Sequence, residues 1–242
     1  MTDLDLSIVV PVFNEAESLP QLHDEIVTAL DPEDLTFEVL YVDDGSTDAT
    51  PGVLAELANS DKRTQIVTLH RNSGQTAAFA AGFRAAEGEV IATLDADLQN
   101  DPADIPKLLA ELESCDIVCG IRADRHDSWV RLASSRIANS VRNSLTHESV
   151  TDVGCSLRVF RSHLVQHLPL FTGMHRFLPT LLRMQGGTLR EIPVRHRARV
   201  HGSSKYGIHN RLWVGLADLF AVRWMQKRWI DSRRSEPPHR PS

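Results

Sequence analysis

Short apolar segments alternate with helix-like segments through the first half of the chain, and this alternation constrains the fold more than any other feature. Segments with the length and apolar content of strands cover 6–13, 37–43, 64–70, 89–95 and 116–122. Strands that are apolar throughout, without alternation, are typical of a parallel sheet buried on both faces. The sequence therefore predicts an α/β fold with a doubly wound, mostly parallel sheet flanked by helices.

The second half of the chain is less regular. We expect further strands over 153–161 and 188–197, and helices over 128–145, 175–187 and 211–230. The organisation predicted from these elements is a catalytic domain over 1–210, an amphipathic helix over 211–230 and a disordered tail over 231–242.

The charge of the chain is unevenly distributed. The formal net charge is -6, yet the segment 195–242 holds 11 basic and 3 acidic residues, a balance of +8, which leaves -14 for the remainder. An acidic body argues against a nucleic-acid-binding protein. The basic segment indicates a local partner of negative charge, such as a phosphate or an anionic lipid, with a solvated tail as the alternative, which we prefer for the last ten residues.

The cysteines and the hydropathy indicate a cytoplasmic protein. Cys115 and Cys119 would lie about 13 Å apart on one strand, too far for a disulfide, and the third cysteine is Cys155. An odd number of cysteines without a framework is typical of the reducing cytoplasm. We find no secretory signal and no run of about 18 apolar residues that would cross a bilayer.

Acidic side chains gather where the predicted strands end. Asp44 follows the second strand, and Asp95 and Asp97 follow the fourth. Ligands of an open parallel sheet bind beyond the carboxyl ends of its strands, and neighbouring carboxylates there need a neutralising charge. If the segment is extended, Asp95, Asp97 and Gln99 point the same way and can converge on one hard divalent cation. Asp48 and Asp101 fit helix or turn capping instead.

The segments 7–19 (SIVVPVFNEAESL), 41–50 (YVDDGSTDAT) and 94–102 (LDADLQNDP) resemble glycosyltransferase family 2. Within it, the segments 71–102 and 199–207 (RVHGSSKYG) look like the branch of dolichol-phosphate mannose synthase and the bacterial polyprenyl-phosphate glycosyltransferases. The resemblance spans roughly residues 5 to 225 and implies a GT-A fold. It implies an inverting transfer from a GDP- or UDP-linked sugar, commonly mannose, to dolichyl or undecaprenyl phosphate. A soluble member that glycosylates a saccharide or a small alcohol is the alternative.

The resemblance also implies a site, residue by residue. The nucleoside side would be formed by Pro11, Phe13, Glu15, Val42 and Asp44, with Asp95 and Ala96 on the ribose or base side. Asp97 and Gln99 would bind Mg²⁺ or Mn²⁺, and Arg122, Arg199 and Lys205 would face phosphates. Phe13 departs from the pattern, because family members often carry tyrosine there.

The acceptor decides whether a general base is needed. A phosphate monoester has a second pKa of roughly 6, so it is already a nucleophile at neutral pH. An alcohol needs a base, for which Asp152 is the candidate, with a turn at the start of a strand as its alternative role. Arg131, Arg136 and Arg142 are available in the sequence to an acceptor phosphate, whereas Arg197 fits a solvated charge.

The helix predicted over 211–230 bears on the acceptor. Trp213, Phe220 and Trp224 fall on one helical face, with Arg223 and Lys227 beside it. Aromatic and basic residues in this arrangement suit a helix that lies in a membrane interface, although an ordinary core-facing helix is an equal alternative. We therefore expect a peripheral protein on the inner face of the cell membrane. Whether it has a membrane-protein partner is open.

Overall fold

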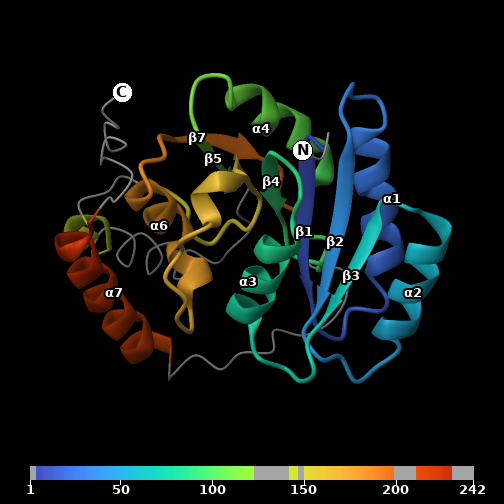
Figure 1. The fold of residues 1–242 in the computed structure, drawn as a ribbon, viewed down its shortest axis with the longest axis horizontal. Helices are drawn as coiled ribbons and strands as arrows, with labels where there is room; N and C mark the ends of the chain where they lie inside the picture. The colour runs from blue at the N-terminus through green and yellow to red at the C-terminus, as the bar shows by residue number, and fades with distance from the viewer. Residues whose placement is uncertain (1–3, 123–141, 147–149, 199–210, 231–242) are drawn as a thin grey trace, which may run out of the picture.

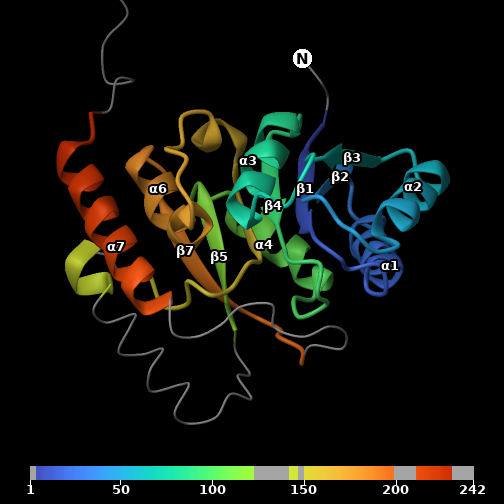
Figure 2. The ribbon, with the colours of Figure 1, turned by 90° about the horizontal axis from the view of Figure 1, so that it is seen from below.

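The computed structural model describes residues 4–122, 142–146, 150–198 and 211–230, which form one sheet between two layers of helices (Figures 1 and 2). The strands are β1 (Leu6–Val12), β2 (Phe37–Asp43), β3 (Thr64–Thr68), β4 (Val90–Thr93), β5 (Ile117–Arg122), β6 (Arg158–Arg161) and β7 (Leu189–Val194). The α-helices are α1 (Leu19–Leu30), α2 (Thr50–Ser60), α3 (Gln75–Ala85), α4 (Ile105–Glu111), α6 (Leu178–Met184) and α7 (Arg211–Arg228). Short 3-10 helices are η1 (Pro102–Asp104), η2 (Ser162–Val165) and η3 (Met174–Phe177).

The strand order confirms the predicted α/β architecture. The seven strands are arranged β3-β2-β1-β4-β6-β5-β7, and only β6 runs against its two neighbours. From β1 the chain winds outward through β2 and β3 and then returns to place β4 on the other side of β1. This reversal creates a switch point at the carboxyl ends of β1 and β4, which is where an open α/β sheet binds its ligands.

Each face of the sheet carries its own hydrophobic core. Successive side chains of β1 point to opposite faces, so Ile8 and Val10 pack under α1 and α4 while Val9 packs under α3. The second core also takes in α6 and the inner side of α7. Figure 1 shows α7 beside α6, at the end of the molecule opposite α1 and α2. This is the two-sided burial that the continuous apolar strands predict.

The alanine-rich helix α3 lies unusually close to the sheet. At Gly82 an added Cβ would overlap Val9 and would come within 3.1 Å of Val42. The small side chains Ala78 and Ala81 are buried along the same helix. Because α3 lies so close to the sheet, its first turn stands directly next to the carboxyl ends of β2 and β4.

Two local expectations are wrong. The strand predicted over 64–70 is not buried on both faces, because β3 is the edge strand and Ile66 is exposed. The sequence also predicts a first helix from 15 to about 30 with Asn14 as its cap, but α1 begins at Leu19 and Asn14 does not cap it. Asn14 adopts a left-handed conformation (φ 53°), and its side-chain oxygen accepts a hydrogen bond from the Thr47 amide at 2.8 Å. Asn14 therefore ties the end of β1 to the loop after β2.

Other expectations can be compared directly with the structure. Cys115, Cys119 and Cys155 are all free thiols, as predicted. Among the described residues, no helix is both long enough and apolar enough to cross a bilayer.

Candidate functional site

The switch point between β1 and β4 brings the predicted carboxylates to one edge of the sheet. Asp44 follows β2 and is 4% exposed. Its two carboxylate oxygens accept hydrogen bonds from the amides of Ser73 and Gly74, at 2.7 and 2.8 Å. Asp44 thus fixes the 70–74 turn that leads into α3. A contact with a nucleoside stays a prediction for this residue.

The segment after β4 is a turn. Residues 96–98 leave the extended conformation, and Leu98 is left-handed with φ 61°. The expectation that Asp95, Asp97 and Gln99 alternate along an extended segment is therefore wrong. The turn itself still holds Asp97 near Gln99, because the Asp97 carboxylate accepts the Gln99 amide at 3.2 Å.

Gln99 is held by contacts with Arg197, which follows β7. Its backbone carbonyl accepts the Arg197 amide at 2.8 Å, and its side-chain Nε2 lies 3.5 Å from the Arg197 carbonyl. With Nε2 directed at Arg197, the amide oxygen of Gln99 is the atom left for a cation. Asp97 is 7% exposed, so little of its surface is accessible to a ligand. The metal assignment of Asp97 and Gln99 stays a prediction.

Asp95 is connected to α3 rather than to Asp97. Its carboxylate accepts a hydrogen bond from Gln75 Nε2 at 2.8 Å, and Gln75 is the first residue of α3. Ala96 is buried next to it. In the described part of the chain, no group of three or more histidine, cysteine, aspartate and glutamate side chains is arranged to hold a metal ion.

Arg122 and Asp152, which the sequence assigns to different tasks, bind each other. The guanidinium Nε and Nη2 donate to the two Asp152 oxygens at 2.7 and 2.8 Å, and the Arg122 amide adds a third bond at 3.2 Å. Asp152 is buried and also accepts the Gly154 amide. The pair joins the end of β5 to the segment before β6. Phosphate binding by Arg122 and base catalysis by Asp152 both stay predictions.

A cavity of about 700 Å³ lies beyond the ends of β1, β2 and β3. Its lining combines the predicted Phe13 with Asp43 and with groups that the sequence analysis did not assign, including Ser46, Arg71 and Asn72. An aromatic ring beside polar and charged side chains is the usual composition of a small-molecule site.

Four of the five residues predicted for the nucleoside side do not line this cavity, and Asp44, described above, is one of them. Val42 is fully buried under α3, so only its backbone faces the edge of the sheet. Glu15 is held by the Thr50 hydroxyl, which accepts its amide at 2.9 Å. Pro11 lies within β1.

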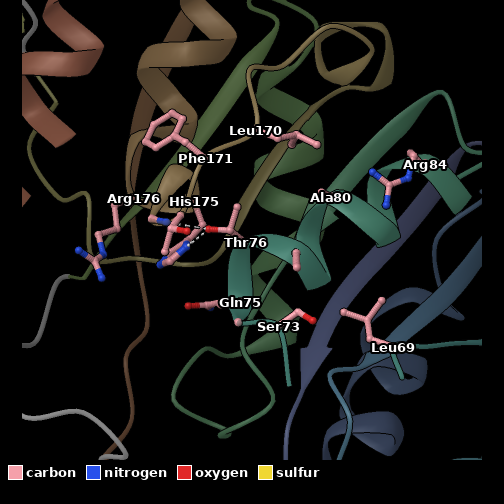
Figure 3. A pocket seen from close by; sticks show the side chains of 14 residues that line it. Leu69, Ser73, Gln75, Thr76, Ala80, Arg84, Leu170, Phe171, His175 and Arg176 are labelled. Atoms are coloured by element: carbon pink, nitrogen blue, oxygen red, sulfur yellow. Dashed lines mark hydrogen bonds between the residues drawn. The ribbon is translucent and has the colours of Figure 1, made fainter. Parts of the chain in front are cut away.

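A second cavity of about 520 Å³ lies between α3 and the segment 170–176, and Figure 3 shows the side chains that line it. Thr76 joins its two walls, because its hydroxyl lies 2.9 Å from His175 Nδ1 and accepts the Gly173 amide at 3.1 Å. Leu69 lines both cavities, so they flank the 70–74 turn that Asp44 holds.

The comparisons with known proteins identify the family of the chain. Residues 7–168 match the model of the family described as glycosyl transferase family 2. The chain belongs to this family. The expected resemblance is thereby confirmed, and with it the GT-A fold.

Two relatives are similar over most of the chain. A dodecaprenyl-phosphate galacturonate synthase from Rhizobium johnstonii is 39% identical over 93% of this chain and 68% of its own length. An undecaprenyl-phosphate 4-deoxy-4-formamido-L-arabinose transferase from Edwardsiella ictaluri is 40% identical over 84% of this chain and 63% of its own. The chain therefore spans about two thirds of the length of these relatives.

Solved structures of other sugar-transferring enzymes share the fold of this chain. Glucosyl-3-phosphoglycerate synthase from Mycobacterium tuberculosis superimposes with a TM-score of 0.66 at 18% identity, covering 95% of this chain and 82% of that one. A mannosyltransferase from Pyrobaculum calidifontis gives a TM-score of 0.62 at 21% identity, covering 96% and 65%. At these identities the likeness concerns the fold alone.

Several cationic residues expected at the family site are not described or lie elsewhere. Arg131, Arg136, Arg199 and Lys205 lie outside the described residues. The expectation that Arg142 is available to an acceptor is wrong, because it is buried, donates to the Thr180 hydroxyl at 2.7 Å and lies over the Phe177 ring.

Arg197, expected to be a solvated charge, forms ion pairs with Glu25 at 2.8 Å and Asp101 at 2.9 Å. Asp101 also accepts the Ala103 amide, which confirms its expected capping role. Arg197 therefore fastens the segment after β7 to α1 and to the start of η1, next to its backbone contact with Gln99.

The sequence analysis missed the residues that form the second cavity. Gln75 and Thr76 were indicated by their place at the start of a helix that follows a parallel strand, which is where that edge of a sheet binds ligands. His175 and Arg176 gave no such signal, because 99 positions separate His175 from Thr76 in the chain. Only the fold brings Gln75 and Thr76 next to His175 and Arg176.

Helix α7 turns its aromatic residues outward. Phe220 and Trp224 are 61% and 63% exposed, while Leu219 and Val222 on the opposite side are buried in the core. Trp213 belongs to the part of α7 whose side chains are not described. The core-facing alternative therefore holds for Leu219 and Val222 and not for the two aromatic residues.

Proposed function

We propose that this chain is a glycosyltransferase that moves a sugar from a nucleoside diphosphate to a polyprenyl phosphate at a membrane surface. The observation that carries the proposal is the 39–40% identity with two relatives whose names state a dodecaprenyl- or undecaprenyl-phosphate acceptor. These relatives carry different sugars, so the similarity alone leaves the sugar open. The nucleobase is equally open.

The predicted donor site supports this reaction. In this proposal the larger cavity, with Phe13 and Arg71, binds the nucleoside, and the turn after β4 faces the diphosphate. Arg199 and Lys205 belong to a glycine-containing segment that, by the resemblance, would stabilise the charge of the leaving diphosphate. By the same resemblance the displacement is direct and inverts the anomeric centre.

A divalent cation fits the residues at the end of β4. Structures of the fold neighbours from Mycobacterium tuberculosis and Pyrobaculum calidifontis were determined with Mn²⁺. Asp97 and Gln99 offer a carboxylate and an amide oxygen, which are ligands that Mg²⁺ and Mn²⁺ prefer. When bound, such an ion would act as a Lewis acid for the diphosphate.

The pairing of Arg122 with Asp152 favours a phosphate acceptor over an alcohol. Two guanidinium nitrogens and the backbone amide of Arg122 already donate to the Asp152 carboxylate, so its oxygens are engaged by Arg122 rather than directed at an acceptor hydroxyl. A phosphate monoester needs no such base, and correct positioning of its oxygen suffices. A saccharide or small alcohol as acceptor is the alternative.

A membrane surface is the place where such an acceptor would be met. The exposed Phe220 and Trp224, with Lys227 and Arg228 in the last turn of α7, suit a helix that rests in the lipid headgroup region. We therefore propose a peripheral association with the cytoplasmic face of the membrane.

The test is a transfer assay with purified protein, Mg²⁺ or Mn²⁺, polyprenyl phosphate in detergent, and a panel of UDP- and GDP-sugars. We expect one donor to yield a glycosyl-phosphoryl lipid detectable by mass spectrometry. The Asp97→Ala variant should lose roughly a hundredfold or more of this activity while its thermal unfolding stays nearly unchanged.

Two outcomes would count against the proposal. Metal-dependent hydrolysis of the donor without any lipid product would move the assignment to a soluble acceptor. Full activity of Asp97→Ala at saturating metal would overturn the metal site.

A further inference from the structure

The second cavity, which we call the α3–η3 cleft, lies next to the predicted diphosphate position and opposite the nucleoside cavity. The two cavities share Leu69 and are separated by the turn that Asp44 holds. Gln75, at the mouth of the α3–η3 cleft, donates directly to Asp95. If the nucleoside lies in the nucleoside cavity and the diphosphate at the end of β4, the sugar, which is attached to the diphosphate, reaches the α3–η3 cleft.

One end of the α3–η3 cleft is lined by polar side chains and suits a polyhydroxyl ring. Ser73, Gln75, Thr76 and His175 present side-chain donors and acceptors around one end of it, as Figure 3 shows. Because Thr76 Oγ1 lies 2.9 Å from His175 Nδ1, a neutral His175 that accepts there carries its hydrogen on Nε2. That nitrogen is then a donor with a fixed ring orientation. The volume of the α3–η3 cleft, about 520 Å³, is within the usual range for a small-molecule site.

The charge of the cleft is one-sided. Its 14 lining residues include Arg84 and Arg176 and no aspartate or glutamate. Among the described residues, Arg176 is exposed and forms no ion pair. Asp218 of α7 is close enough for its charge to interact with Arg176, but it faces Gly173 from behind the cleft wall and does not line the cavity. None of the lining side chains is acidic, so none competes with a ligand carboxylate for the Arg176 guanidinium inside the cleft.

The two arginines are at opposite ends of the cleft. Arg176 adjoins His175 and Thr76, close to the Asp95 end, as Figure 3 shows. Arg84 lies nine residues beyond Gln75 on α3, which is about 13 Å along the helix axis. A single sugar ring that reaches Gln75 therefore lies nearer to Arg176 than to Arg84, as Figure 3 shows.

We propose that the α3–η3 cleft binds the sugar of the donor and that His175 and Arg176 select a sugar bearing a carboxylate, a hexuronate, over a neutral hexose. A guanidinium binds a carboxylate through two parallel hydrogen bonds, which a hydroxymethyl group cannot form. This inference rests on the proposed function, because it takes the ligand to be a nucleotide sugar.

The experiment compares donors that differ only at C6: UDP-glucuronate with UDP-glucose, and UDP-galacturonate with UDP-galactose. Equilibrium binding is measured by calorimetry with Mn²⁺ and without acceptor, and transfer to polyprenyl phosphate is measured separately. We expect the wild-type protein to bind one uronate donor at least about tenfold more tightly than its neutral partner. Arg176→Gln should bring this ratio close to one, and Arg176→Lys should retain part of it.

Arg84→Gln is the matched control, since it removes the same charge from the far end of the same cleft. It should leave the uronate-to-hexose ratio within about twofold of the wild-type value. Because Arg84 and Arg176 are both exposed, neither variant should change the thermal unfolding of the protein.

The outcomes separate the inference from the function on which it rests. A neutral donor bound as well as its uronate partner, or a ratio that Arg84→Gln lowers as much as Arg176→Gln does, would overturn the inference. If a neutral sugar is transferred to the lipid without preference, the proposed function stands and the inference fails. No binding of any nucleotide sugar would overturn both.

Discussion

At the scale of single residues, the chain uses its carboxylates for two purposes that the sequence alone does not separate. Asp44 and Asp95 each accept hydrogen bonds from the start of α3, so they shape the edge of the sheet. Asp152 is bound by Arg122. The carboxylate of Asp97 is engaged by its own turn. Only the structure distinguishes an acid that positions a loop from one that is placed for a ligand.

The Arg122–Asp152 pair gives a test of this distinction. Arg122→Met should destabilise the fold by about 3 kcal/mol, because it leaves a buried carboxylate without its partner. Arg122→Met with Asp152→Asn should recover most of that loss, since no buried charge remains. The measurement is urea unfolding of both variants beside the transfer assay.

Activity then decides the role of Arg122. If the arginine binds substrate phosphate, the double variant regains stability and remains inactive. If activity returns together with stability, the arginine is only a structural tie and its predicted phosphate role is wrong.

His23 gives the residue-scale prediction for pH. It is buried between α1 and β2, with Nδ1 3.2 Å from the Tyr41 hydroxyl and Nε2 3.4 Å from Asp61. Burial lowers the pKa of His23 below its ordinary value, although Asp61 opposes this effect. The unfolded chain therefore takes up a proton first as the pH falls below about 6.5. Stability contributed by the neutral imidazole is complete above that pH and is lost as the pH falls toward the folded-state pKa.

The check is the free energy of unfolding of wild type and His23→Gln between pH 7.5 and 5. We expect a shallower decline with falling pH in the variant, because it has no imidazole to protonate. Equal slopes in the two proteins would show that His23 is not the group responsible.

At the scale of elements, the apolar strand pattern was sufficient to predict the sheet, and local hydrogen bonds account for what it missed. All five strands of the first half are present, and all but the edge strand β3 bury a run of β-branched and aliphatic side chains. The strand β6 lies within the strand predicted over 153–161, but its antiparallel direction was not predicted, since strand direction depends on the connections between strands. The predicted alternation of Asp95, Asp97 and Gln99 requires an extended segment after β4, yet Leu98 adopts the left-handed conformation there and the segment turns.

The helix α7 carries the element-scale prediction. Phe220→Ser with Trp224→Ser should abolish co-sedimentation with anionic lipid vesicles and leave the unfolding temperature nearly unchanged, because both side chains are exposed. Leu219→Ala is the matched control from the buried side of the same helix, and we expect it to destabilise the fold by about 2–4 kcal/mol. Vesicle binding that survives the serine variant would place the membrane contact elsewhere.

At the scale of the whole molecule, the two cavities and the turn between them form one continuous edge across β1 to β4. Leu69 is shared by both cavities, and the start of α3 is bonded both to Asp44 and to Asp95. A nucleotide sugar that occupies the whole edge would therefore bridge elements from both halves of the chain. Such a ligand stabilises the folded state without binding the unfolded one.

This continuity predicts a shift in the unfolding temperature that depends on both the nucleotide and the divalent metal ion. UDP or GDP at about one hundred times its dissociation constant should stabilise the protein by roughly 2.7 kcal/mol, which raises the unfolding temperature of a chain of this size by about 5–10 °C. The shift should require Mn²⁺ or Mg²⁺, because the diphosphate would be held through the ion at Asp97 and Gln99. In Asp97→Ala the nucleotide should give no more than the small metal-independent shift. An equal shift in the variant, or in the wild type without metal, would mean that the nucleotide is held by the loop residues alone and that the end of β4 is not a metal site.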